Sequence, residues 1–153
     1  PSDLDAVAGL EAECFPKAEA ATKEQFQERL KAYGNHFLLL FYAGRLISFI
    51  NGFVSNQKDL FDEMYENVSL HDEDGDWQMI FGVNTHPEFQ KRGIATRMMQ
   101  VFLEEAEKEG RKGAVLTCKE EKIPFYSRCG FVLEGKSASV HGDAEWYQMR
   151  RRF

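Results

Sequence analysis

Residues 77–96 constrain the fold most, because an apolar run, a turn and a basic glycine-bearing loop stand directly before an amphipathic stretch. The apolar residues of Trp77–Thr85 predict a central strand. The turn at His86-Pro87 ends this strand, and the loop Gln90–Ala95 then opens a helix. The chain is therefore expected to contain a strand, a loop and a helix in immediate succession.

The chemistry of this loop suits an anion. A helix start leaves about four backbone N–H groups without partners and carries about half a positive charge. Gly93 has no Cβ to keep a ligand away, and Lys91 and Arg92 add cationic donors. A basic stretch before a helix can also be a solvated cap. We interpret the loop as a phosphate-binding site.

Two motifs carry a resemblance to a known family. Gln90–Ala95 matches the Q/R-x-x-G-x-G/A signature of the GNAT superfamily of acyl-CoA-dependent N-acyltransferases, after a strand and at a helix start. Downstream, Ile123–Phe131 resembles that family's x-P-F-Y-x-x-x-G-F segment. The resemblance covers most of the chain. It implies an α/β (α+β) GNAT fold, with a central mixed and mostly antiparallel sheet flanked by helices.

The resemblance also implies a binding site for acetyl-CoA. In this family the central strand separates from the next one after a bulge, and the pantetheine arm pairs with the exposed backbone like an added strand. Gly82 could mark that bulge or could be a close-packing position. The residues implied to bind the cofactor are Phe81, Val83, Asn84, Thr85, Gln90, Lys91, Arg92, Gly93, Ile94, Ala95, Thr96 and Tyr126.

Acyl transfer to an amine needs a proton acceptor and a proton donor. A primary amine with a pKa near 10 is free base in only about one molecule in a thousand at pH 7. By type, Glu63, Glu66, Asp76 and His141 could take its proton, as could a water chain. The family resemblance assigns the protonation of the leaving thiolate to Tyr126, and implies that the amide of Val83 polarises the thioester carbonyl.

Within the superfamily the chain is most similar to the arylalkylamine (serotonin) N-acetyltransferase-like branch. Thr117-Cys118, Ile123–Tyr126, His141-Gly142 and Trp146–Met149 carry this similarity. Animal members have a His-x-His pair on the central strand, where this chain has Met79-Ile80-Phe81. The base is therefore unassigned. The residues expected to bind the acceptor, a small-molecule amine, are Phe15, Glu19, Thr117 and His141.

Composition excludes several other classes. The 153 residues suit a single domain, 1–153, and 43% hydrophobic content can build a core. A net charge of −6 argues against nucleic-acid binding. Three cysteines without metal-ligand spacing suggest neither disulfides nor a metal site, so we expect a cytoplasmic protein. The sequence lacks a membrane-spanning run and a signal pattern. A monomer or homodimer is equally compatible.

Local patterns predict the remaining elements. They are helices from Ser2 to Phe15-Pro16 and from Thr22 to Gly34, a hairpin of Phe37–Tyr42 with Leu46–Val54, a helix ending at Gly110, a strand Gly113–Cys118, a short helix Pro124–Cys129, and strands Phe131–Glu134 and Ala144–Arg150. The segment 56–76 is predicted to form a helical turn or two over Lys58–Glu66 and then an acidic loop over His71–Asp76, with a polar composition typical of a mobile connection. It could be a solvated connection or an acidic lip that attracts a cationic substrate.

Two other functions fit parts of the pattern. A peptide or protein N-acetyltransferase would need an open groove with main-chain partners, whereas the phenylalanine-rich segments favour a closed pocket. A non-catalytic acyl-CoA-binding module would keep Gln90–Ala95 but would not need Tyr126. We therefore expect an enzyme that acetylates a small amine.

Overall fold

A computed structural model describes residues 3–137, 139 and 144–153. Its helices are α1 (Leu4–Cys14), α2 (Lys23–Tyr33), α3 (Glu63–Glu66), α4 (Ile94–Lys108) and α5 (Ile123–Arg128), and its 3₁₀ turns are η1 (Gly34–His36), η2 (Val68–Leu70), η3 (Pro87–Phe89) and η4 (Glu120–Lys122). Its strands are β1 (Phe37–Tyr42), β2 (Arg45–Asn51), β3 (Val54–Ser55), β4 (Trp77–Ile80), β5 (Gly82–Thr85), β6 (Gly113–Cys118), β7 (Val132–Lys136) and β8 (Tyr147–Arg152).

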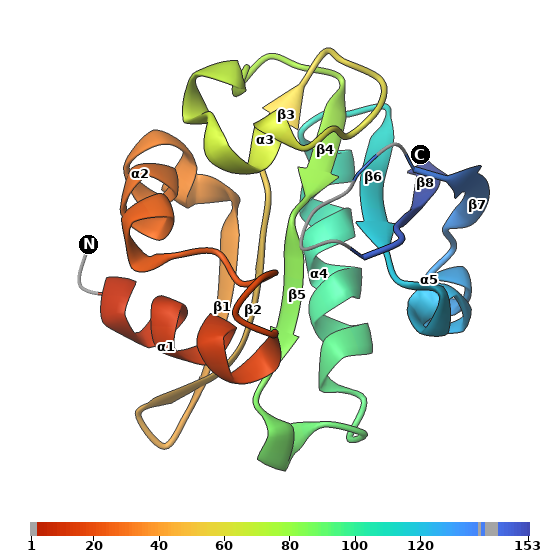
Figure 1. Ribbon diagram of the computed structural model, residues 1–153. Coiled ribbons are helices and arrows are strands. Elements are labelled where there is room, and N and C mark those ends of the chain that lie inside the picture. The colour runs from red at the N-terminus through yellow and green to blue at the C-terminus, as the bar shows by residue number, and fades with distance from the viewer. Residues whose placement is uncertain (1–2, 138, 140–143) are drawn as a thin grey trace.

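The strands form two sheets, in the orders β1-β2-β5 and β3-β4-β6-β8-β7 (Figure 1). Among the strand pairs that the structure describes, only β4–β6 is parallel, so the arrangement is mixed and mostly antiparallel, as predicted. The predicted central strand is divided at Phe81 between the two sheets. β4 pairs with β6, whereas β5 pairs with β2, and this change of partner separates β5 from β6.

The predicted hairpin is also divided. Its second run forms β2 as far as Asn51, and then crosses at Gly52-Phe53 into β3 of the other sheet. At the crossing, a Cβ on Gly52 would lie 1.8 Å from the carbonyl oxygen of Met79. The backbones can approach this closely only because position 52 lacks a side chain.

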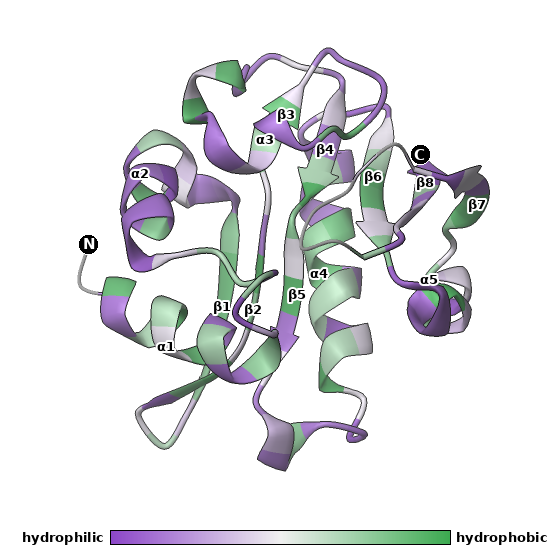
Figure 2. Cartoon of the chain, in the orientation of Figure 1, coloured by the Kyte–Doolittle hydropathy of each residue, from purple (hydrophilic) through white to green (hydrophobic). Residues whose placement is uncertain are grey.

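Helices cover both faces of the β1-β2-β5 sheet. Side chains alternate along a strand, so Phe49 packs with Val7 and Phe26 of α1 and α2, while Ile50 packs against α4. The first turn of α2 has the predicted capping box, in which Thr22 and Gln25 bond each other's backbone N–H groups. Figure 2 shows apolar residues along the central strands and on one side of α4.

The segment 56–76 contains the predicted helical turn, as α3, but its apolar side chains are more buried than its polar composition suggests. Leu60 and Met64 are buried beside Trp77, and Tyr65 packs on Phe81 with ring centroids 4.9 Å apart. The charged residues around these three apolar side chains obscured their burial. Among residues 3–137, 139 and 144–153, none of the helices combines the length and apolar character needed to cross a bilayer.

Candidate active site

Two hollows meet where β5 separates from β6. The inner cavity, of about 220 Å³, is lined by residues of α1, α2, α3, β4, β5, β6 and the segments after α1 and β6. The outer groove, of about 530 Å³, follows β5, the loop Gln90–Gly93, the start of α4 and one side of α5. Val83, Glu121, Lys122 and Tyr126 line both. A molecule in the groove can therefore reach one in the cavity at these residues.

The glycine-bearing loop presents the start of α4 to the outer groove. Gly93, the N-cap residue, has φ of 79°, and no side chain caps the helix. Lys91 also has a positive φ, 63°. A Cβ added at Gly93 would meet no atom within 4 Å, so this side of the loop is open. The first-turn amides and the Lys91 ammonium can therefore hold phosphate groups.

The outer edge of β5 lies in the same groove. The amide of His86 donates to the carbonyl oxygen of Ile47 at 2.7 Å, which fixes the alternation along the β2–β5 pair. In an antiparallel ladder every second residue turns its backbone groups away from the partner strand, so Val83 and Thr85 point outward. The carbonyl oxygen of Thr85 accepts a bond from the Gln90 side chain at 3.1 Å. The Val83 amide faces the groove, where an extended ligand arm could bind it.

Tyr126 projects from α5 into the junction of the two hollows. Its ring is half-buried and contacts Phe125 and Phe131 edge-on, with centroid distances of 5.0 and 6.0 Å. Burial, assisted by the neighbouring Cys118, Cys129 and Tyr65, raises the pKa of its phenol. The group is therefore neutral at pH 7 and able to donate a proton.

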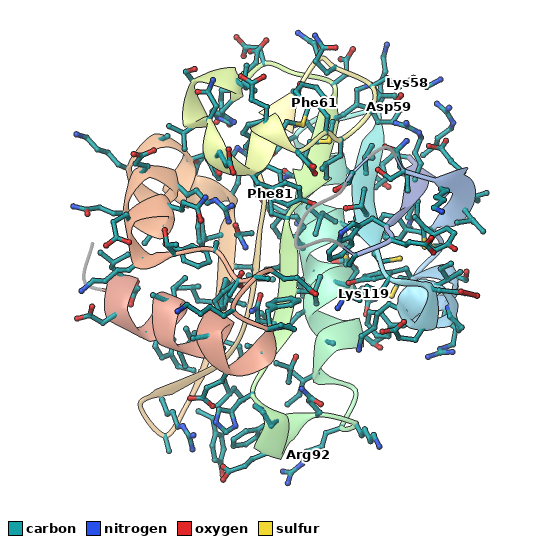
Figure 3. All side chains as sticks on the ribbon, viewed as in Figure 1. Lys58, Asp59, Phe61, Phe81, Arg92 and Lys119 are labelled. Atoms are coloured by element: carbon teal, nitrogen blue, oxygen red, sulfur yellow. The ribbon has the colours of Figure 1, made fainter. Side chains whose placement is uncertain are left out.

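The walls of the inner cavity are mostly apolar and aromatic. Its lining residues include Phe15, Pro16, Tyr65, Phe81 and Trp146. The Tyr65 hydroxyl lies 2.9 Å from Oγ1 of Thr117 on β6, and burial raises the pKa of Tyr65 to about 12. In Figure 3, Phe81 is near the middle of the molecule, and Lys119 is beside α4 and α5.

An ion pair joins two wall segments at the side of the inner cavity. Lys119, directly after β6, places its Nζ 2.7 Å from Oε2 of Glu19 in the segment between α1 and α2. The same ammonium lies 5.9 Å from the centroid of the Trp146 ring. Because Glu19, Lys119 and Trp146 all line the cavity, these contacts tie three separate segments around it.

Glu11 is a carboxylate of this cavity that sequence reasoning missed. It is only 6% exposed, and its oxygens accept bonds from the amide of Ala21 and from Nδ2 of Asn84, both at 2.9 Å. Gly82 contributes space beside it, since a Cβ there would be 3.9 Å from Oε1 of Glu11. In the sequence Glu11 is one of several acids of α1, and no motif distinguishes it.

The predicted site residues fall into three groups. Phe15, Glu19, Thr117 and Phe81 line the inner cavity; Thr85, Gln90, Lys91, Gly93, Ile94, Ala95 and Thr96 line the groove; Val83 and Tyr126 line both. His141 lies outside the described residues.

Two predicted cofactor ligands lie elsewhere. Asn84 turns its backbone toward β2 and its buried side chain toward Glu11, because it alternates with Val83. The Arg92 guanidinium lies over the Phe89 ring, 5.3 Å from its centroid, at the lower end of the molecule in Figure 3. Neither residue is among those that line the outer groove.

The acidic segment 71–76 does not border the inner cavity, and neither do Glu63 and Glu66. These residues were candidates for the base or for an acidic lip. Asp76 pairs with Lys112, with 3.3 Å between nitrogen and oxygen. Glu73 is bound by His36, His71 and Arg111. Two of the four acids of this segment are thus paired locally, at the opposite end of β4 from β5.

The cluster of His36, His71 and Glu73 has the residue types of a metal site, with ligand atoms within 4.8 Å of one another. However, the Val54 amide donates to Nδ1 of His71 at 3.1 Å. This bond leaves the ring proton on Nε2, which faces Glu73 at 3.0 Å. Nε2 therefore donates to the carboxylate and has no free electron pair for a metal. The cluster is therefore a set of hydrogen-bonded side chains and not a metal site.

Comparison with known proteins agrees with this geometry. The profile of the Acetyltransferase (GNAT) family matches residues 4–131. The chain belongs to this family. It is 24% identical to the serotonin N-acetyltransferase of Mesocricetus auratus, over 98% of the chain and 73% of the relative.

Solved GNAT structures share the fold. The loading GNATL domain of CurA from Lyngbya majuscula has a TM-score of 0.88 at 16% identity, covering 99% of this chain and 93% of that one. The GphF GNAT-like decarboxylase in complex with isobutyryl-CoA has a TM-score of 0.84 at 18% identity, covering 99% and 95%. Membership of the GNAT family makes this chain an acyltransferase, with acetyl-CoA as its acyl donor. The open loop at Gly93 and the edge of β5 fit its phosphates and extended arm.

Proposed function

We propose that this GNAT protein transfers the acetyl group of acetyl-CoA to the primary amine of a small molecule bound in the inner cavity. The observation that carries the proposal is the junction of the two hollows at Val83 and Tyr126. The groove suits the acyl donor, and the cavity beyond the junction suits the acceptor. An amine in the cavity would face the thioester carbon directly.

In the proposed reaction the amine nitrogen attacks the acyl carbon, an N–C bond forms and the C–S bond breaks. The Val83 amide faces the groove and would stabilise the negative charge on the carbonyl oxygen. Tyr126 would protonate the leaving thiolate, because its phenol is neutral and lies at the junction.

Glu11 is the side chain that we propose to receive the amine proton, either directly or through water. Hydrogen bonds from Ala21 and Asn84 hold the carboxylate in place on the cavity wall. A primary amine is about 99.9% protonated at pH 7. Forming the free base therefore costs roughly 4 kcal/mol of free energy, which a base such as Glu11 can offset. The histidine pair of animal relatives is replaced here by Met79 and Phe81.

The small volume and mostly apolar, aromatic walls of the inner cavity favour a small acceptor over a peptide. A protein substrate would need an open groove with backbone partners, whereas the Glu19–Lys119 ion pair joins two walls of this cavity. Screening amines, polyamines, amino acids and peptides for CoA release from acetyl-CoA tests the proposal. We expect turnover with at least one small primary amine and less with peptides. Acetylation confined to peptides would contradict it.

A further inference from the structure

Arg29 of α2 is a buried cation on the wall of the inner cavity, and the reaction described above does not use it. Its side chain is 3% exposed. One Nη atom donates to Oδ1 of Asn51 at 3.1 Å and the other to the carbonyl oxygen of Tyr65 at 2.8 Å. Nε has no hydrogen-bond partner among the described residues. A guanidinium has five N–H donors, so several of them remain available.

Within residues 3–137, 139 and 144–153, the surroundings of Arg29 give its charge no direct counter-ion. The guanidinium lies 5.2 Å from the centroid of the Phe26 ring and 5.1 Å from that of Phe81. In the part of the chain that the structure describes, no carboxylate lies within 4.0 Å of it. Two neutral oxygens and two aromatic rings compensate a buried charge less well than an anion does.

The same cavity holds the opposite charge on Glu11. Arg29 and Glu11 come from different helices, α2 and α1, and both line the inner cavity. The two groups are not paired with each other within 4.0 Å, although both act on the phenol of Tyr65. The cavity therefore offers one anionic and one cationic side chain to a single small ligand. The Phe81 ring, which Arg29 contacts, adds an apolar surface.

We propose that the acetyl acceptor is a small amino acid, whose carboxylate binds Arg29 while its amine lies beside Glu11. This inference rests on the proposed acetyltransfer and names its substrate class. A guanidinium binds a carboxylate with two parallel hydrogen bonds, which a carbonyl oxygen or an aromatic ring cannot replace. The bound carboxylate would compensate the buried charge and fix the amine.

The reaction remains balanced with this acceptor. The N–C amide bond forms as the thioester C–S bond breaks, one amine proton passes toward Glu11, and the thiolate gains a proton from Tyr126. The products are an N-acetylamino acid and CoA. The carboxylate on Arg29 takes no part in bond making, so Arg29 is a specificity-determining residue.

The test uses acceptor pairs that differ only in a carboxylate, such as 2-phenylethylamine with phenylalanine and propylamine with 4-aminobutyrate. For the wild type we expect kcat/KM to be at least tenfold higher for one or more carboxylate-bearing members. Arg29→Met should reduce this ratio to about one, and Arg29→Lys should leave an intermediate value. Taking the ratio within each variant removes any general loss of folded enzyme. Lys31→Met, at an exposed cation of the same helix, is the matched control and should keep the wild-type ratio.

Several results would overturn the inference. Three of them are a preference for the carboxylate-free amines, a carboxylate preference that persists in Arg29→Met, and an Arg29-dependent preference for malonyl-CoA over acetyl-CoA, which would place the carboxylate on the donor. An enzyme that acetylates plain amines without any carboxylate preference would refute the inference but leave the proposed function intact. Thermal shifts of the CoA-loaded protein with each acceptor give a readout independent of turnover. If amino acids produce no Arg29-dependent shift, the inference is also refuted.

Discussion

Val83 on β5 and Tyr126 on α5 both lie at the junction of the inner cavity and the outer groove, since each lines both hollows. The two residues are 43 positions apart in the sequence. They meet because the chain changes sheets at Phe81, which leaves the edge of β5 open toward α5. The division of one predicted strand therefore creates the place where donor and acceptor can react.

Cofactor binding should raise the thermal stability of the protein. CoA and acetyl-CoA are expected to raise the melting temperature, while adenosine alone should do so weakly, because we assign the phosphates rather than the base to the open loop at Gly93. At 100 times its dissociation constant a ligand stabilises the folded state by about 2.7 kcal/mol. Differential scanning fluorimetry checks this. The absence of any shift at millimolar CoA would contradict the assignment of the groove.

Gly93→Val should block CoA binding while the protein remains folded. The added side chain would enter open space on the groove side, and the positive φ of 79° adds strain of about 1–2 kcal/mol. Gly110→Val is a matched control, because Gly110 has φ of 84° and also no neighbour within 4 Å, but lies at the other end of α4. Calorimetry should show lost affinity only in Gly93→Val. Equal CoA affinity in both folded variants would mean that the loop is only a helix cap.

Glu11→Gln should lower kcat/KM at pH 7 by roughly 10²-fold or more, since it removes the proposed proton acceptor with little change of shape. Glu13→Gln is the control on the same helix, because Glu13 is exposed and pairs with His86 instead of lining the cavity. The defect should shrink toward pH 10, where the amine is deprotonated in solution. A rate that stays at the wild-type value in Glu11→Gln would remove this residue from the mechanism.

Stability should fall as the pH drops below about 6.5, through His71. Burial lowers the pKa of His71, and its Nδ1 already accepts the Val54 amide, so protonation must break that bond. The pKa of His71 is lower in the folded state than in the unfolded state. The contribution of the neutral ring to stability is therefore complete above the unfolded-state pKa near 6.5 and is lost as the pH falls through the folded-state pKa. The titratable and charged groups around it are His36, Glu73 and Arg111.

Urea denaturation at pH 7.5 and 5.5 measures this loss. His71→Asn keeps an acceptor near the position of Nδ1 without a titrating ring, so its free energy of unfolding should vary less between the two pH values. An equal pH dependence in the wild type and His71→Asn would assign the effect to other groups.

The fold was largely predictable, because its signals are local. The capping box at Thr22, the glycine loop at Gly93 and the short helix of Tyr126 each depend on a few neighbouring residues. The division of Trp77–Thr85 was less visible, since the run Met79–Val83 continues across it without a polar residue or a proline. Only their different partners, β6 and β2, separate them.

The acceptor site was harder to predict than the donor site. Glu11 and Arg29 reach the cavity from two helices whose sequences read as ordinary amphipathic surfaces. Their roles emerge only in the folded structure, where both side chains are buried and bond residues distant in the sequence. Asn84 binds Glu11, and Asn51 binds Arg29. Conversely, the acidic residues 71–76 looked functional, but His36 and Arg111 bind Glu73 far from the cavity.

The central claim, that acyl transfer occurs at the junction, is tested most directly at Tyr126. Tyr126→Phe removes one hydroxyl and little volume, so acetyl-CoA affinity should stay within a few-fold. Single-turnover rates with a working amine should fall roughly 10²-fold or more, because the thiolate loses its proton donor. The melting temperature measured in parallel separates this from a packing role beside Phe125 and Phe131. A folded Tyr126→Phe enzyme that turns over at the wild-type rate would contradict the account.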